Sequence, residues 1–442
     1  MTAQGEGAAA SPLQAVIDKG AFTPVQILVV ALCTFVAVAE GIDLNMIPLL
    51  AGAIRADWGL PSSAFGAIFA AGPIGLIIGG ASVGYFSDRF GRRWALIGAM
   101  LVMTAATVAT AFVTDVPELL VCRVLTGIGF GGIVPVTSTM VSEFVPTRAR
   151  ASIVALVILG QAAGGLFAAL LMKTAIADAP WQTLILYAAA LCAVTTLVIL
   201  ALLPESPRYL LLKHAGTPRL ASMLRRLRIA DAPDLSAAAE GGERRNRFLA
   251  LFTEGRALGT ALLWAIFIGI CAPVSFLTSW IALIYTYADK PAAAGVSASA
   301  AYWAGGIAGG LVLPIFCRWW HVNKVLMAVI LGGALSVAGL GSVLTLGDTV
   351  NLAMAFVTGV FISGAFYMMY PPAVHFYPTA IRSTGVGSAV AFGRIGNTVS
   401  PAVAGLLLAG GFGPGFVFGM MALPLLLSFA ALVGFDRLTA RG

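Results

Sequence analysis

The chain has 442 residues, of which 59% are hydrophobic and only 10% are charged, whereas a soluble globular protein carries about 25% charged residues. This composition excludes a soluble globular protein and predicts an integral membrane protein. It is predicted to be α-helical, because the alternating ten-residue segments of a membrane β-barrel do not occur. The net charge of +7 does not indicate nucleic-acid binding, because the excess of Lys and Arg can be placed in loops on one side of the membrane.

Twelve apolar runs follow one another along the chain, and each is about long enough to cross a bilayer as a helix. They cover 25–54, 62–85, 94–114, 117–141, 151–174, 181–203, 257–287, 295–318, 324–346, 350–372, 384–409 and 414–434. An even number of spans places both termini on one side. Almost all Lys and Arg fall on that side, with only Arg55, Lys173 and Lys290 on the opposite side and Arg123 and Arg394 within spans. Both termini are therefore predicted to be cytoplasmic.

A long basic segment at 204–256 divides the spans into six and six. The sequence thus predicts an all-α membrane protein with twelve transmembrane helices in two six-helix halves. The predicted division is a cytoplasmic tail at 1–24, of which 1–20 is expected to be unstructured, a first half at 25–203, a cytoplasmic central loop at 204–256, a second half at 257–434 and a cytoplasmic tail at 435–442. Glycine pairs four residues apart, such as Gly75/Gly79 and Gly305/Gly309, predict helices whose backbones approach closely.

A dense charged patch separates the second and third spans, with the sequence Gly84-Tyr85-Phe86-Ser87-Asp88-Arg89-Phe90-Gly91-Arg92-Arg93. This pattern, G-x-x-x-D-R-x-G-R-R, resembles the loop between helices 2 and 3 of the major facilitator superfamily. The resemblance implies the major facilitator fold and a group of residues that control opening and closing: Gly84, Asp88, Arg89, Gly91 and Arg92, with Arg148 and Arg382 from the paired inner loops after spans 4 and 10. Asp88 is expected to dock on the positive N-terminus of span 11 and close the inner side.

Further strings resemble one family within that superfamily, the aromatic acid:proton symporters. They are Glu40-Gly41-Ile42-Asp43 in span 1, Arg123 to Gly132 with Pro135 in span 4, Phe276 to Trp280 in span 7, and Gly393-Arg394-Ile395-Gly396 with Pro401 in span 11. The chain departs from the family pattern at Glu40, where Asp is usual, at Val136, where Asn is usual, and at His375. These departures bear on the substrate more than on the mechanism.

Two carboxyl groups lie near the middle of span 1. Glu40 and Asp43 are three residues apart, so they share one face of a helix. An ionised carboxylate in hydrocarbon costs about 3 kcal/mol or more. The pair is therefore predicted to face a central cavity and to pick up and release a proton. The alternative for either residue is a neutral carboxyl group that is hydrogen-bonded to a neighbouring helix.

Two arginines lie inside the spans, and each is a candidate to bind an anionic substrate. Arg394 is near the midplane in span 11 and is the first choice, while Arg123 lies nearer one end of span 4. The planar fork of a guanidinium suits a carboxylate. The alternative is a structural role, which for Arg123 is an internal salt bridge with Asp43.

Aromatic and polar side chains in the spans complete the candidate substrate site. The candidates are Trp280, Tyr302, Trp303, Tyr367 and Tyr370, which can stack on a ring, and Gln161 and Asn397, which can donate hydrogen bonds. Plain packing between helices is the alternative for each of the aromatic residues.

The sequence lacks the motifs that would indicate other functional classes. The three histidines, His214, His321 and His375, are scattered, so neither a metal site nor an enzyme is predicted. The five cysteines are predicted to be free thiols, and the chain has no phosphate-binding glycine loop with Lys and Ser or Thr, which disfavours transport driven by ATP. No cofactor is expected.

The predicted function is proton-coupled uptake of an organic carboxylate by alternating access. The substrate is predicted to be an aromatic acid such as a hydroxybenzoate. A monomer in the bacterial plasma membrane is expected, with the organic anion, protons and the lipid bilayer as its partners and no nucleic acid. The alternative is a proton-coupled sugar or other small-metabolite porter, although the P-E-T-x-G string of sugar porters is absent after span 12.

Overall fold

A computed structural model describes residues 12–175, 179–214, 216–229, 248–378 and 381–440, and this part of the chain is built of helices without a strand. The first half contains α2 (Pro24–Trp58), α3 (Ser62–Phe90), α4 (Arg92–Thr110), α5 (Val116–Phe144), α6 (Thr147–Ala175) and α7 (Trp181–Leu202). The central segment contributes the short helices α8 (Pro207–Lys213), α9 (Pro218–Arg226) and η2 (Leu249–Leu251).

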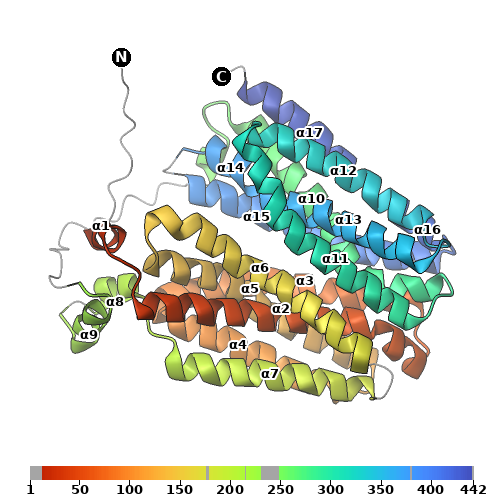
Figure 1. The fold of residues 1–442 in the computed structure, drawn as a ribbon, viewed down its shortest axis with the longest axis horizontal. Helices are drawn as coiled ribbons and strands as arrows, with labels where there is room; N and C mark the ends of the chain where they lie inside the picture. Colours follow the sequence, from red (N-terminus) through yellow and green to blue (C-terminus); the bar gives the residue numbers. More distant parts are fainter. Residues whose placement is uncertain (1–11, 176–178, 215, 230–247, 379–380, 441–442) are drawn as a thin grey trace.

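The second half contains α10 (Ala257–Tyr287), α11 (Ala292–Val312) with η3 (Leu313–Arg318), α12 (Val322–Ser342), α13 (Asp348–Met368) with α14 (Tyr370–Phe376), α15 (Arg382–Ala409), and α16 (Pro414–Met420) with α17 (Leu423–Thr439). Figure 1 shows the helices α2 to α7 side by side in one half and the helices α10 to α17 in the other. The predicted two-half, all-α architecture is confirmed.

Eleven of the predicted spans correspond to helices in the described residues that are long and apolar enough to cross a membrane. The twelfth, α15, has 28 residues and is also long enough. It is less apolar than the others because Arg394 and Asn397 lie in its interior. The helix that looks least like a membrane span is therefore the one that carries a candidate substrate-binding residue.

Glycines allow the helices within each half to approach closely. A Cβ atom at Gly75 of α3 would overlap the carbonyl oxygen of Val124 in α5, and a Cβ atom at Gly305 of α11 would overlap that of Phe356 in α13. Such contacts between backbones leave no room for a side chain. The close packing predicted from the spacing of glycines is confirmed at both pairs.

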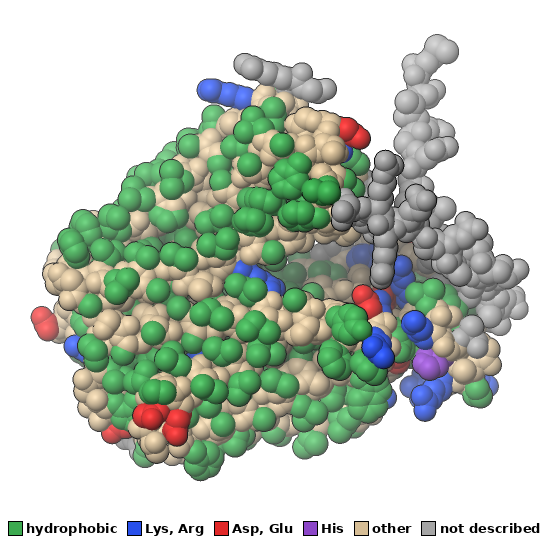
Figure 2. Space-filling model, turned by 180° about the vertical axis from the view of Figure 1, so that it is seen from behind, with side chains coloured by type: hydrophobic (Ala, Val, Ile, Leu, Met, Phe, Trp, Pro, Cys, Tyr) green, Lys and Arg blue, Asp and Glu red, His purple; other side chains and the backbone are tan. Residues whose placement is uncertain are grey.

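The two halves meet mainly along α3 and α15, and along α6 and α11. At one end of the molecule they also touch through Arg55 of α2, whose guanidinium lies 4.0 Å from the ring centre of Tyr287, and through Phe69 of α3, whose ring is 5.1 Å from that of Trp280. Figure 2 shows a hollow between the halves, with a Lys or Arg side chain in it, that opens toward the opposite end. That open end carries α1, α8 and α9 (Figure 1).

The N-terminal segment departs from the predicted unstructured tail, because α1 (Pro12–Lys19) is a helix. Asp18 caps α6 by accepting hydrogen bonds from the backbone N–H of Thr147 at 2.6 Å and from its hydroxyl at 2.8 Å. The hydrogen bond from that backbone N–H is the main cause that lowers the pKa of Asp18. Ile17 is buried beside it, so an apolar contact and a helix cap together hold α1 to the end of α6.

The glycine contacts predict a clear difference between two Gly→Ala variants. Gly75→Ala places a methyl group against the Val124 carbonyl, and we expect it to lower the free energy of unfolding by about 1–3 kcal/mol, the usual cost of overpacking. Gly98→Ala in α4 is the matched control, because a Cβ atom there meets nothing within 4 Å. The Tm of the purified protein in detergent measures both, and an equal shift in the two variants would contradict the packing argument.

Candidate functional site

The two carboxyl groups of α2 lie deep inside the first half. Glu40 and Asp43 are each only 2% exposed. The hydroxyl of Thr107 in α4 donates to Oδ1 of Asp43 at 2.6 Å, and Nε2 of Gln161 in α6 donates to Oε1 of Glu40 at 3.3 Å. The second oxygen of each carboxyl group is buried without a partner among the described residues. Each group therefore has one fixed oxygen and one oxygen that can carry a proton.

Arg123 lies on α5 in the same half and is buried. Its guanidinium packs against Gly72 of α3 and interacts electrostatically with Asp43. Among the described residues, however, no salt bridge joins Arg123 to a carboxylate. The structure therefore places Arg123 next to the carboxyl pair, within the first half, rather than between the halves.

Arg394 reaches across the boundary between the halves. From α15 its Nη1 donates to the carbonyl oxygen of Leu76 in α3 at 2.6 Å. The glycine at position 80 makes this possible, because a Cβ atom there would overlap the Arg394 guanidinium. The side chain is only partly buried. One of its five N–H groups is thus occupied, and the remaining donors can bind an anion.

Tyr370 connects Arg394 to a group of aromatic side chains in the second half. Tyr370 at the start of α14 interacts with it electrostatically, and the Tyr370 ring lies 5.6 Å from that of Phe267 in α10. Phe366 is 5.7 Å from Tyr367 and 6.3 Å from Tyr370, measured between ring centres. No hydrogen bond to another described residue uses the hydroxyl of Tyr367 or Tyr370. A cation, aromatic faces and free hydroxyl groups therefore gather in one region.

The other aromatic candidates contact the protein itself. Trp280 is fully buried, donates to the carbonyl of Pro401 at 3.1 Å and packs on Phe69 at the closed end. Trp303 crosses between the halves and donates to Oδ1 of Asn45 at 3.2 Å. Tyr302 is fully buried. In this conformation none of the three lies open to a substrate.

Asn397, one turn after Arg394 on α15, is half-buried, and its backbone carbonyl accepts a hydrogen bond from the Ser275 hydroxyl at 2.7 Å. The side chain of Asn397 has no hydrogen-bond partner among the described residues. Of the polar candidates, Asn397 is therefore the one beside Arg394, whereas Gln161 is engaged by Glu40.

The charged patch between α3 and α4 forms a network within the first half. Arg92 pairs with Glu143 at the end of α5 at 3.4 Å and with Asp88 at 3.6 Å. The Glu143 side chain is 6% exposed, whereas that of Asp88 is 82% exposed. Glu143 also accepts a hydrogen bond from Ser206, directly after the central segment begins. Among the described residues, Arg92 is the only ion-pair partner of Asp88, and the Asp88 side chain is largely exposed, so the predicted lock on α15 is not formed in this conformation.

The remaining members of the patch differ in what holds them. Gly91 has φ +103°, and a Cβ atom there would overlap the Glu205 carboxylate, so glycine is required. A Cβ atom at Gly84 meets nothing within 4 Å. Arg89 donates to Tyr85 at 3.1 Å, Arg382 donates to the carbonyl of Tyr377 at 3.2 Å, and Arg148 is exposed.

Sequence reasoning missed the partners of these residues. Thr107, Leu76 and Asn45 lie on helices that are far apart in sequence from the residues they bind, and a lone Thr or Asn in an apolar run carries no signal. Glu143 had a weak signal, because it is an acidic residue at the inner end of a span, directly before the loop that contains Arg148.

The network predicts that Glu143 matters more for stability than Asp88. Glu143→Gln keeps an acceptor for Ser206 but removes the buried one of the two charge partners of Arg92 and leaves only the exposed Asp88, so we expect a loss of about 3 kcal/mol. Asp88→Asn removes an exposed pair and is expected to cost less than about 1 kcal/mol. Both are measured as Tm in detergent, and the prediction is wrong if Asp88→Asn lowers the Tm as much as Glu143→Gln.

Known proteins agree with this architecture. The xylose transporter XylE from Escherichia coli, in a partially occluded inward-open conformation, superimposes with a TM-score of 0.72 at 16% identity, covering 92% of this chain and 98% of that chain. The 4-hydroxybenzoate transporter of Pseudomonas aeruginosa is 29% identical, covering 95% of each chain. The 3-(3-hydroxy-phenyl)propionate transporter of Escherichia coli is 31% identical, covering 89% of each chain. The family model of the Major Facilitator Superfamily matches residues 33–374. The chain therefore belongs to the major facilitator superfamily, and it is a multi-pass membrane transporter rather than an enzyme.

Proposed function

We propose that this protein takes up an aromatic carboxylate together with protons by alternating access. The observation that carries the proposal is Arg394, a partly exposed cation at the boundary of the two halves near Tyr370, whose neighbour Phe366 also packs on Tyr367. An anion in the middle of a membrane needs such a cation. The relatives named for 4-hydroxybenzoate and 3-(3-hydroxy-phenyl)propionate both take ligands that combine a carboxylate with a ring.

In this proposal Arg394 binds the carboxylate, and Tyr367, Tyr370 and Asn397 contact the ring or its hydroxyl group. The free hydroxyls of the tyrosines provide donors for a phenol oxygen, while their faces and that of Phe366 accept an aromatic ring. Trp280 then lies at the closed end, and Trp303 lies between the halves. In these positions they would control access to the substrate site rather than bind the substrate.

Protons are proposed to bind Asp43, with Glu40 as a second carboxyl group that tunes the first. The buried oxygens without partners support this role. Arg123, which shares the first half with them, is proposed to respond to the charge of Asp43. The Asp88 lock is proposed to form only when the inner side closes, because Asp88 is exposed while the hollow is open.

The membrane orientation follows from the same proposal. The relatives are bacterial, and we place the protein as a monomer in the inner membrane with both termini cytoplasmic, where positively charged loops are retained. The end that carries α8 and α9 is then the cytoplasmic side, and the conformation described here is open to the cytoplasm.

The first functional test is uptake of 4-hydroxybenzoate into proteoliposomes with an imposed proton gradient. We expect accumulation above the external concentration in the wild type, and no accumulation of xylose. Asp43→Asn should abolish the accumulation but keep exchange of labelled for unlabelled substrate, because only the proton site is lost. Glu40→Gln should reduce accumulation less. Unchanged accumulation by Asp43→Asn would remove Asp43 from the proposed coupling.

The second test isolates the carboxylate contact. Arg394→Ala should weaken binding of 4-hydroxybenzoate by about 1.5–3 kcal/mol, the scale of a charge-assisted hydrogen bond, and Arg394→Lys should restore only part of it. The control ligand is 4-hydroxybenzamide, which has no carboxylate. A purely conformational effect of losing the contact to Leu76 would weaken both ligands equally, and that result would assign Arg394 to structure alone.

A further inference from the structure

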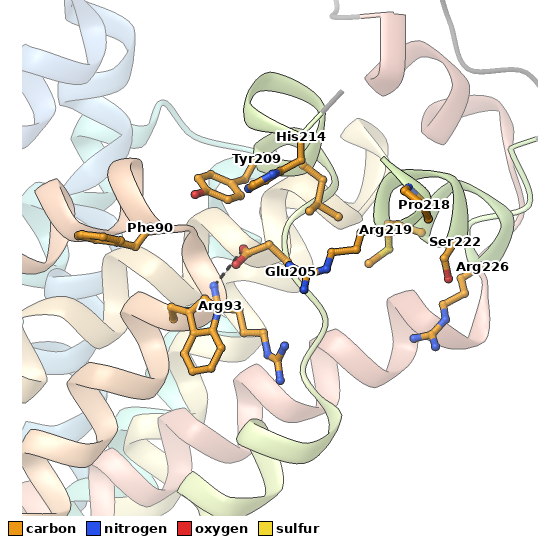
Figure 3. Close-up of a pocket in the computed structure, with 12 residues that line it drawn as sticks. Phe90, Arg93, Glu205, Tyr209, His214, Pro218, Arg219, Ser222 and Arg226 are labelled. Carbon is orange, nitrogen blue, oxygen red and sulfur yellow. Dashed lines mark hydrogen bonds between the residues drawn. The ribbon is translucent and has the colours of Figure 1, made fainter. Parts of the chain in front are cut away.

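A pocket of about 540 Å³ lies at the open end of the first half, away from the proposed transport site. It is formed where the end of α3 and the start of α4 face α8 and α9 of the central segment (Figure 3). The polar residues that line it are Arg93, Glu205, Tyr209, His214, Arg219, Ser222 and Arg226. Nothing in the proposed transport cycle uses this pocket.

The orientation of α9 explains why Arg219 and Arg226 face the pocket. Leu220, Met223 and Leu224 of α9 are buried against the first half. Arg219, Ser222 and Arg226 follow at spacings of three and four residues, so they occupy a common, outward side of the helix. Figure 3 shows the Arg219 side chain extending from α9 toward Glu205.

The charge of the pocket is unbalanced. It contains three arginines and one carboxylate. That carboxylate is occupied, because Oε1 of Glu205 accepts hydrogen bonds from the backbone N–H groups of Arg93 at 3.1 Å and Ser206 at 2.8 Å. Burial is the main cause that raises the pKa of Glu205. Arg219 and Arg226 have no acidic partner among the described residues.

One wall of the pocket is aromatic. The guanidinium of Arg93 lies 5.2 Å from the ring centre of Trp94. It donates a hydrogen bond to the carbonyl of Leu200 at 2.8 Å, and its buried Nε has no acceptor in the described part of the chain. Trp94 is 54% exposed and Phe90 is 48% exposed. Both stand at the ends of membrane-spanning helices, where aromatic residues sit at the level of lipid headgroups.

We propose that this pocket binds a phosphate group, either of an anionic phospholipid headgroup or of a soluble phosphate ester. The guanidinium groups of the arginines and the hydroxyl of Ser222 can donate hydrogen bonds to the oxygens of a phosphate. A bound phosphate would be held between α9 and the turn that joins α3 to α4. It would thus fasten the central segment to the charged patch that changes its contacts when the inner side closes.

The test measures binding of three probes to the full-length protein in a neutral detergent by native mass spectrometry. The probes are dioctanoyl phosphatidylglycerol, dioctanoyl phosphatidylcholine and glycerol 3-phosphate. We expect saturable binding of at least one of the two anionic probes, and no comparable binding of phosphatidylcholine. Arg219→Gln combined with Arg226→Gln should weaken it at least about tenfold, the scale of one charge-assisted hydrogen bond.

Arg208→Gln combined with Arg225→Gln is the matched control, because these two exposed arginines belong to α8 and α9 but do not line the pocket. We expect less than a twofold change. Ser222→Glu, which adds one negative charge inside the pocket, provides a second variant that keeps all the arginines, and it should weaken binding in the same way.

The outcomes separate the sources of the phosphate. If glycerol 3-phosphate displaces the lipid at the concentrations at which the lipid itself binds, the ligand is a soluble phosphate ester. If the lipid binds and glycerol 3-phosphate does not displace it, the ligand is the lipid headgroup. Equal weakening in the pocket and control variants would show attraction to general positive charge and overturn the proposal. So would equal binding of phosphatidylcholine, or no saturable binding of either anionic probe.

Discussion

A charged side chain inside a bilayer must be neutralised, paired or hydrated, and four charged residues in the interior of the described spans are divided between the two halves. Glu40, Asp43 and Arg123 lie together in the first half, and Arg394 extends from the second half to the backbone of α3. In the proposed mechanism this division separates the proton site from the substrate cation. Protonation of Asp43 then changes the electrostatic energy of a bound anion without direct contact, which couples the two fluxes.

The boundary between the halves depends on two glycines of the first half. Gly80 of α3 leaves room for the guanidinium of Arg394, and Gly165 of α6 leaves room for the indole of Trp303, which donates to Asn45. In each contact, a side chain of the second half packs on a helix surface of the first half where a glycine has no side chain. Both lie on the helix pairs along which the halves meet. Contacts of this kind, with a single hydrogen bond each, can persist while the halves rock.

Hydropathy and charge are local properties, so the sequence alone predicted the spans, the two halves and the charged patch. The partner of each buried polar group depends on which helices face each other, and a single sequence does not contain that information. Thus the sequence left open whether Asp43 faces a central cavity or bonds to a neighbouring helix, and it did not identify Thr107 of α4, which donates a hydrogen bond to it. Trp280 was a candidate either to stack on a substrate or to pack between helices, and in this conformation it packs on Phe69 at one end of the molecule. The helix α1 was missed because only eight residues form it.

The contact between Arg394 and Leu76 has a consequence for transport. A guanidinium that is already bound to a carbonyl of the other half can accept a substrate carboxylate only on its remaining donors. The carboxylate would then be linked through Arg394 to both halves at once. Any rotation of one half relative to the other moves the Leu76 carbonyl relative to Arg394. The number of Arg394 N–H groups that are free to bind a substrate then changes. In the proposed mechanism, the affinity for the anion therefore differs between the inward-open and outward-open states, and this difference is what a ligand needs in order to shift their populations.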